Sequence, residues 1–111
     1  MDLAVPDFAA AAEQAIHALV ERLHPLAIVW FGSASRGQAG PNSDLDFLVV
    51  FSRDAGGKFE LFKQAQKAIW NVPAPIDLLI YYPDEVADKR DSLGSVVREA
   101  LNTGRVVHGQ V

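Results

Sequence analysis

Three aspartates stand in segments that otherwise have the composition of buried β-strands. Asp44 and Asp46 lie at the start of an apolar run that continues to Phe51, and Asp77 is flanked by aliphatic residues in the run Ile76–Tyr82. Strand side chains alternate between faces, so Asp44 and Asp46 share one face, with Cα atoms about 7 Å apart. Carboxylates in such places are costly unless a cation neutralises them, and all-oxygen ligation suits Mg²⁺ or Mn²⁺. The pattern therefore predicts a divalent metal site.

A purely structural interpretation of the same aspartates competes with this one. A lone Asp44 is typical of a strand cap, Asp46 of a solvent-facing position, and Asp77 of an ion pair with an arginine. For any single aspartate the structural interpretation is the better one. The occurrence of three, two of them on one strand face, favours the metal site.

The loop after an earlier apolar run, Leu26–Phe31, has the composition of an anion-binding turn. It reads Gly-Ser-Ala-Ser-Arg-Gly from Gly32 to Gly37. Small residues let backbone amides approach a phosphate, Ser33 adds a hydroxyl donor, and the guanidinium of Arg36 matches phosphate oxygens. An ordinary surface turn has the same composition, and neither a Walker A motif nor a Gly-x-Gly-x-x-Gly fingerprint is present. The loop alone is therefore weak evidence for nucleotide binding.

The spacing between this loop and the aspartates makes the combination more specific. Gly32-Ser33 is followed, after ten residues, by Asp44-x-Asp46. A phosphate-binding turn and a metal-binding acid pair on neighbouring strands are what metal-assisted phosphoryl or nucleotidyl transfer requires. The glycine and glutamate of an EF-hand loop are absent, and a dehalogenase-type acid pair follows its strand whereas this pair precedes it. Nucleotidyl or phosphoryl transfer is the chemistry that remains.

Alternating helix-like and strand-like segments must position these residues. Apolar residues at three- and four-residue steps predict amphipathic helices at residues 8–23, 59–71 and 93–101, and their buried stripes are expected to include Phe59, Ala65, Ile69 and Leu93. Short apolar runs predict strands at residues 26–31, 45–51, 76–82 and 105–108. Trp30 and Trp70 fall in apolar stripes and are expected in the core, and Ser92 and Gly104 are expected to cap the last helix. The order of elements is expected to be α-β-α-β-α-β.

Length and composition exclude several classes of protein. The chain has 111 residues, half of them hydrophobic, and residues 1–111 are expected to form one domain. The absence of cysteine excludes disulfides, a thiolate nucleophile and Cys-based zinc sites. A net charge of −4 argues against a protein that binds nucleic acid by neutralising phosphates. Neither a signal-peptide pattern nor a membrane-spanning apolar stretch is present, so a cytoplasmic protein is expected.

The combined pattern resembles the minimal nucleotidyltransferase domains of the DNA polymerase β superfamily. The resemblance rests on two motifs and a later strand aspartate, namely Gly32-Ser33 with Arg36-Gly37, Ser43-Asp44-Leu45-Asp46, and Asp77. It extends over most of the chain and implies an α+β fold with a small mixed sheet flanked by helices. The implied reaction moves a nucleoside monophosphate from an NTP, usually ATP, to an acceptor hydroxyl and releases pyrophosphate.

The resemblance also implies roles for individual residues. The catalytic residues and the ligands of two Mg²⁺ ions, or of Mn²⁺, would be Asp44, Asp46 and Asp77. The first two would bridge both ions, and Asp77 would hold the ion that activates the acceptor hydroxyl. The nucleotide-binding residues would be Gly32, Ser33 and Arg36.

Proteins of this size and motif resemble antitoxins that are encoded beside HEPN-family toxins. That kinship implies transfer of AMP to a tyrosine of the toxin, which would be both acceptor and complex partner. A non-catalytic antitoxin that neutralises its partner by occlusion is one alternative, which the intact set of predicted ligands disfavours. A small-molecule nucleotidyltransferase of the aminoglycoside-modifying kind is another, and those enzymes carry a further helical domain for the acceptor. Membrane and nucleic-acid partners are not expected, and homo- and hetero-oligomers both stay open.

Overall fold

The helices and strands follow the apolar segments of the sequence. The computed structural model describes residues 7–111, and Met1–Pro6, on which the expectation of no export signal rests, lie outside the described residues. The described elements are α1 (Phe8–Leu23), β1 (Ala27–Phe31), β2 (Leu45–Val50), α2 (Lys58–Ala68), β3 (Ile76–Tyr81), α3 (Pro83–Lys89), α4 (Val96–Thr103) and β4 (Arg105–Gly109). Two short 3₁₀ turns, η1 (Ser33–Arg36) and η2 (Arg53–Ala55), follow β1 and β2. Within residues 7–111, no helix has the length and apolar character needed to cross a membrane.

The predicted α+β class is confirmed, but the predicted alternating order is wrong at two places. β1 and β2 follow each other with only η1 between them, because an antiparallel pair can be joined by a short loop and needs no helix. Two helices rather than one lie between β3 and β4. The additional helix, α3, forms in the acidic stretch after β3, where Pro83 occupies a first-turn position that favours helix initiation.

A single four-stranded sheet with the order β3-β2-β1-β4 organises the described residues. β1 is antiparallel to β2 and β4, whereas β2 and β3 are parallel and are joined by a crossover through α2. The sheet is therefore mixed, as the resemblance implied. Its register aligns Phe31 with Asp46 and Asp46 with Asp77, so the end of β1 meets the starts of β2 and β3 at one end of the sheet.

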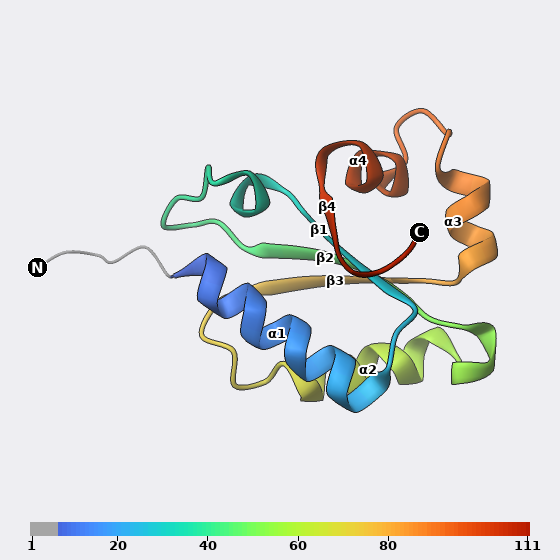
Figure 1. The fold of residues 1–111 in the computed structure, drawn as a ribbon, viewed down its shortest axis with the longest axis horizontal. Helices are drawn as coiled ribbons and strands as arrows, with labels where there is room; N and C mark the ends of the chain where they lie inside the picture. The colour runs from blue at the N-terminus through green and yellow to red at the C-terminus, as the bar shows by residue number, and fades with distance from the viewer. Residues whose placement is uncertain (1–6) are drawn as a thin grey trace, which may run out of the picture.

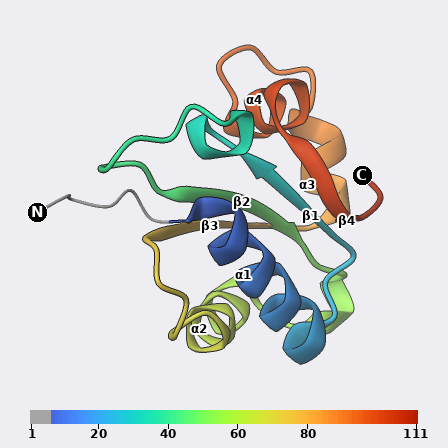
Figure 2. The same cartoon turned by 60° about the vertical axis from the view of Figure 1, so that its left-hand side comes forward.

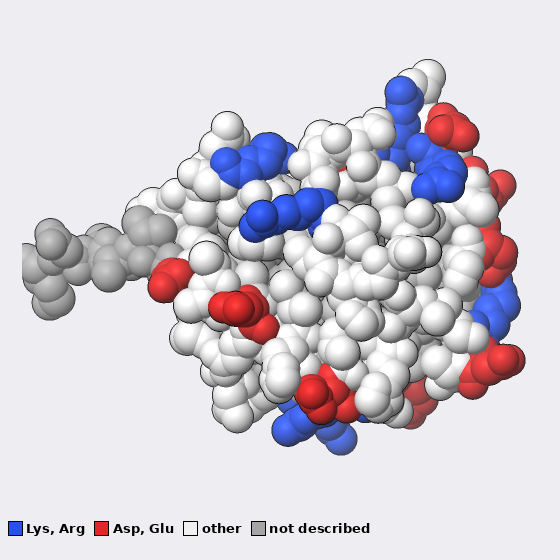
Figure 3. Space-filling model, in the orientation of Figure 1, with Lys and Arg blue, Asp and Glu red and all other residues white. Residues whose placement is uncertain are grey.

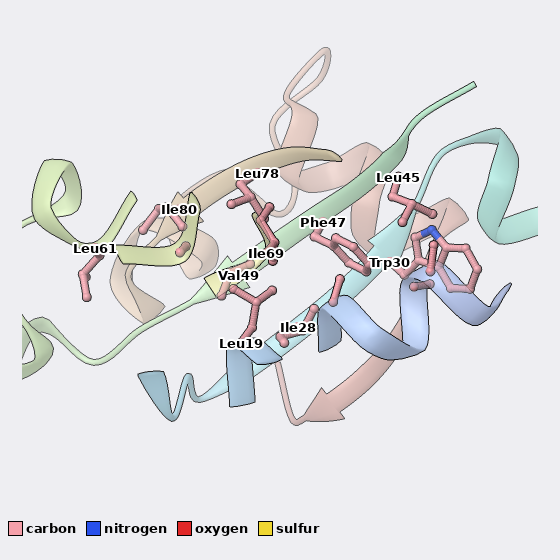
Figure 4. Close-up of a cluster of buried hydrophobic side chains, with 14 of the residues drawn as sticks. Leu19, Ile28, Trp30, Leu45, Phe47, Val49, Leu61, Ile69, Leu78 and Ile80 are labelled. Atoms are coloured by element: carbon pink, nitrogen blue, oxygen red, sulfur yellow. The ribbon is translucent and has the colours of Figure 1, made fainter. Parts of the chain in front are cut away.

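Helices cover both faces of this sheet. Figures 1 and 2 show α1 and α2 on one side and α3 and α4 on the other. The side chains of the two central strands alternate between the two resulting cores, which explains why their sequences are apolar except at Asp46. Figure 4 shows the core on the α1–α2 side, whose strand residues include Ile28, Trp30, Phe47 and Val49. The core on the α3–α4 side contains Val29, Phe31, Leu48, Val50, Val97 and Ala100.

Of the two caps predicted for the last helix, α4, the structure confirms only the C-terminal one. The helix ends at Gly104, as predicted, but it begins after Ser95 rather than after Ser92. The Ser95 hydroxyl accepts a hydrogen bond from the N–H of Arg98 at 3.0 Å, which is the ordinary geometry of an N-cap. A Cβ at Gly104 would lie 2.7 Å from the carbonyl oxygen of Trp30, so this glycine lets α4 pack closely on β1.

The two tryptophans, both expected in the core, have opposite environments. Trp30 is buried, at 5% exposure, and the guanidinium of Arg105 lies 4.9 Å from the centre of its ring. The indole N–H of Trp30 has no hydrogen-bond partner within residues 7–111. Trp70 is 82% exposed, so the prediction was wrong for this residue. It lies beyond the end of α2, where the helical periodicity no longer fixes which way a side chain points.

The buried face of α2 differs from the predicted one. Leu61 and Ala65, four residues apart, point into the core, and Ile69 continues this row just after the helix. Phe59 lies off the row and is 74% exposed. Leu93, predicted on the buried stripe of the last helix, precedes that helix and is 87% exposed. The predictions for Ala65 and Ile69 are confirmed, whereas those for Phe59 and Leu93 were wrong. Phe59 lies off the row of residues that meets the sheet, and Leu93 lies before the helix begins.

Charged side chains are spread unevenly over the face formed by α1. Figure 3 shows a broad uncharged centre, with acidic and basic groups mostly toward the margins. The basic groups on this face form no continuous track of the kind that follows a nucleic-acid backbone.

Candidate active site

The three predicted aspartates meet at one end of the sheet. Asp44 directly precedes β2, Asp46 is the second residue of β2, and Asp77 is the second residue of β3. The parallel register places Asp46 and Asp77 opposite each other. One carboxylate oxygen from each of the three residues lies within 4.8 Å of the other two. The structure therefore forms the cluster that the sequence predicted.

The electrostatics of this cluster centre on Asp46. Asp44 and Asp77 are exposed, whereas Asp46 is half-buried. Partial burial, and then the neighbouring charges of Asp44 and Asp77, raise the pKa of the Asp46 carboxyl to about 6 from an ordinary 3.8. A further contribution comes from Glu99 on α4. The cluster thus concentrates negative charge that its surroundings do not neutralise.

No basic side chain compensates the cluster. Within residues 7–111, none of the three carboxylates forms an ion pair with a lysine, arginine or histidine. The described residues therefore do not show the Asp77–arginine ion pair of the structural interpretation. Convergent carboxylate oxygens without an ion-pair partner are the donor set that Mg²⁺ and Mn²⁺ prefer, so the residues fit a divalent cation.

Gly32 brings the glycine-serine loop into contact with the carboxylates. Its φ is +85° and its ψ is −179°, a conformation that essentially only glycine adopts. A Cβ at this position would overlap with Oδ2 of Asp46, so any larger residue would collide with the cluster. The loop backbone at Gly32 and the Asp46 side chain are therefore in direct contact. This contact explains why a glycine follows β1.

Hydrogen bonds of serine hydroxyls stabilise the rest of the loop between β1 and β2. The hydroxyl of Ser35 donates a hydrogen bond to the carbonyl of Gly32 at 2.7 Å. Ser43 accepts one from the N–H of Gly40 at 2.9 Å, and its hydroxyl lies 3.4 Å from that of Ser33. Both ends of the loop are thus tied together directly beside Asp44. Arg36, at the end of η1, is exposed, where it can reach a ligand in solvent.

Two residues near the cluster were not singled out from the sequence. Ser43 was only part of the motif around Asp44, and its place next to that aspartate is the signal that could have drawn attention to it. Glu99 lies on α4, and its proximity to Asp46 depends on how α4 packs over β1. No sequence pattern connects Glu99 with β2, so only the fold identifies it.

Comparison with known proteins decides the family. Residues 12–107 match the nucleotidyltransferase domain family. The chain belongs to this family. The predicted membership of the nucleotidyltransferase superfamily is thereby confirmed, and the cluster of Asp44, Asp46 and Asp77 with its glycine-serine loop lies inside the matched region.

Solved structures share the fold of this nucleotidyltransferase domain. A crystal structure of a toxin–antitoxin with AMP-PNP is 22% identical, with a TM-score of 0.53, and the match covers 88% of this chain and 73% of the other. A mutant of the toxin–antitoxin MntA-HpeT is 19% identical, with a TM-score of 0.50 and coverage of 88% and 72%. No curated protein matches the chain.

Proposed function

We propose that this nucleotidyltransferase domain, taken as residues 1–111, uses Mg²⁺ to transfer AMP from ATP to a hydroxyl of a partner protein, as the antitoxin of a toxin–antitoxin pair. The observation that carries the proposal is the direct contact between Gly32 and Asp46, which joins a phosphate-binding turn to metal-binding carboxylates. The toxin–antitoxin pairing, and the AMP-PNP in one relative of the same fold, support the choice of ATP and of a protein partner.

Each proposed role follows from the chemistry of the group. Gly32 and Ser33 offer backbone and hydroxyl donors to the triphosphate, and Arg36 offsets the charge that develops on the leaving pyrophosphate. Mg²⁺, when bound, neutralises phosphate oxygens and lowers the pKa of the acceptor hydroxyl. The ligands that would hold it are Asp44, Asp46 and Asp77.

The proposed reaction exchanges one phosphorus–oxygen bond for another. The acceptor oxygen forms a bond to the α-phosphorus of ATP, and the bond from that phosphorus to the bridging oxygen of the β-phosphate breaks. The hydroxyl proton passes to the carboxylate of Asp77, and pyrophosphate leaves. A tyrosine of a HEPN-type toxin is the proposed acceptor, because a phenol, with a pKa of about 10, loses its proton far more readily than an aliphatic hydroxyl.

A label-transfer experiment tests the proposal. The protein is incubated with Mg²⁺ and ATP labelled at either the α- or the γ-phosphate, with and without the protein encoded by the neighbouring gene. We expect α-label, and no γ-label, to reach the partner. Asp44→Asn should lower the rate by about a hundredfold or more, because a charged ligand is lost from the transition state. Asp88→Asn, an exposed aspartate on α3, is the matched control and should transfer at the normal rate.

Three outcomes would contradict the proposal. Transfer of γ-label would identify a kinase instead of a nucleotidyltransferase acting on protein. Inhibition of the partner without any label transfer would support the occlusion mechanism. Normal transfer by Asp44→Asn would show that the metal assignment is wrong.

A further inference from the structure

β3 forms one edge of the sheet, and its outer backbone groups have no strand partner within residues 7–111. The N–H of Leu45 donates to the carbonyl of Pro75, and the N–H of Phe51 donates to the carbonyl of Tyr81. In a parallel ladder, alternate residues of a strand bond to the same neighbour, so the odd-numbered residues of β3 face β2. The N–H and C=O groups of the even-numbered residues therefore point outward, and these residues are Ile76, Leu78 and Ile80.

This edge has few of the features that usually prevent strand pairing. Protected edges carry lysine, proline or a bulge, or are covered by another element. β3 contains no lysine or proline, and its register with β2 is continuous. The opposite edge strand, β4, has an irregular register with β1. The sole charged residue of β3 is Asp77, which lies at the end of the strand nearest the candidate active site.

An apolar hollow runs alongside the exposed edge. It has a volume of about 420 Å³ and lies between α2 and β3, where Phe59 and Phe62 face Leu78 and Ile80 and where Lys58 is the one charged lining residue. Phe59 is 74% exposed and Phe62 is 38% exposed. Unpaired backbone groups and exposed aromatic side chains thus form one continuous surface, which we call the β3 edge. Apolar patches of this kind mark interaction sites.

We propose that the β3 edge binds the β3 edge of a second copy of this chain, in antiparallel orientation, so that two four-stranded sheets become one continuous sheet. A two-fold interface requires a surface to be complementary to itself. Centred on Leu78, the pairing sets Leu78 opposite the partner's Leu78 and Ile76 opposite the partner's Ile80. All outward N–H and C=O groups of β3 then find partners, and the phenylalanines of the two α2 helices meet across the axis.

Charge complementarity also favours a second copy and this register. Asp77 falls opposite the partner's Leu79, so no like charges face each other on the strands. A register centred on Asp77 would set the two Asp77 carboxylates opposite each other, which is destabilising. On α2, Glu60 and Lys63 form an ion pair of 3.1 Å beside Phe59. Because this pair carries both signs, Glu60 of one copy can pair with Lys63 of the other copy across a two-fold axis.

Sedimentation velocity at increasing protein concentration tests the interface on the metal-free chain, so the result does not depend on the proposed reaction. We expect a reversible monomer–dimer equilibrium. Phe59→Glu, a surface change with little effect on folding, should weaken the dimer about tenfold or more, because it puts charge into the apolar centre of the interface. Leu93→Glu, at an equally exposed leucine outside the β3 edge, is the matched control and should dimerise normally.

Amide hydrogen exchange provides a readout that needs no variant. The N–H groups of Leu78 and Ile80 should become protected as concentration rises, whereas those of Leu79 and Tyr81, which face β2, should be protected at every concentration. A monomer at all concentrations would overturn the proposal. So would a dimer in which Leu78 and Ile80 still exchange freely, or one that Phe59→Glu leaves intact. Protection of these amides only by a different protein would assign the edge to a foreign strand instead.

Discussion

Asp46 is held in a place that lowers the stability of the metal-free fold. Its carboxylate is half-buried beside two others, and its pKa is raised to about 6. In the unfolded chain the same carboxyl is surrounded by water and titrates near 3.8. The folded state therefore binds the Asp46 proton more tightly than the unfolded state does. Such conflicts between charges concentrate at functional sites, where a ligand resolves them.

The raised pKa of Asp46 predicts a pH dependence of stability. In the absence of metal, Asp46 should lower the free energy of unfolding as pH rises from about 4 to about 7, because the folded state must release a proton that it holds more tightly. Asp46→Asn should remove this slope and stabilise the metal-free protein at pH 7 by about 1 kcal/mol, a value reduced for the partial solvation of the group. Urea unfolding in EDTA across this pH range measures the effect.

The control for this experiment is Asp88→Asn, which removes an exposed acid remote from the cluster. It should keep the slope of the wild-type protein. If Asp46→Asn were no more stable than wild type at pH 7 and kept the slope, burial and the neighbouring carboxylates would not raise the pKa of Asp46 as their positions indicate.

At the scale of elements, the site depends on how β1 ends. β1 delivers the chain to the cluster at Phe31, and Gly32 then turns it into η1 without obstructing Asp46. The sequence predicted both the strand and the glycine-serine loop, because apolar runs and small residues are local signals. It did not predict the contact between Gly32 and Asp46, because that contact depends on the antiparallel register of β1 and β2.

Gly32→Ala is expected to damage both the fold and the site. The added methyl group would require an unfavourable φ and would displace the Asp46 carboxylate, so we expect a loss of about 1–3 kcal/mol in the free energy of unfolding. We also expect a clear loss of affinity for Mg²⁺·ATP. Denaturant unfolding and equilibrium binding measure the two effects. Gly40→Ala is the control within the same loop, because a Cβ there meets no atom within 4 Å. Equal behaviour of the two variants would contradict the role given to Gly32.

Helix positions were predicted better than helix faces. The predicted helices overlap α1, α2 and α4, yet Phe59 and Leu93 are exposed, and α3 was not among the helices expected from the apolar stripes. Periodicity shows that an element is amphipathic, but the boundary of the buried stripe depends on what the helix packs against. For α2 the smaller residues Leu61 and Ala65 meet the sheet.

At the scale of the whole molecule, the acidic balance is connected to the site. The chain carries a net charge of −4, and three of its fourteen acidic residues form the cluster. Composition could show the excess of acid but not its location. The fold shows that location, because the parallel register of β2 and β3 brings these acids together at one end of the sheet.

Binding of a divalent cation should therefore stabilise the entire fold. A ligand that binds only the folded state adds about 2.7 kcal/mol to the free energy of unfolding when its free concentration is about a hundred times its Kd. For a domain of this size, that raises Tm by roughly 10 °C or more. We expect Mg²⁺ and Mn²⁺ to raise Tm in calorimetry, and KCl at equal ionic strength to have little effect. The Asp77→Asn protein should show a much smaller shift. An unchanged Mg²⁺ shift in that variant would place the cation elsewhere.

The contrasting environments of Trp30 and Trp70 give the molecule two distinguishable fluorophores. Trp30 is enclosed by apolar side chains one residue before the end of β1, so its emission should be shifted to short wavelength and resistant to acrylamide. Trp70 is almost fully hydrated and should emit as a free indole does and be quenched readily. The emission of Trp30 therefore reports on β1, the strand that leads to the glycine-serine loop, and the emission of Trp70 serves as an internal reference.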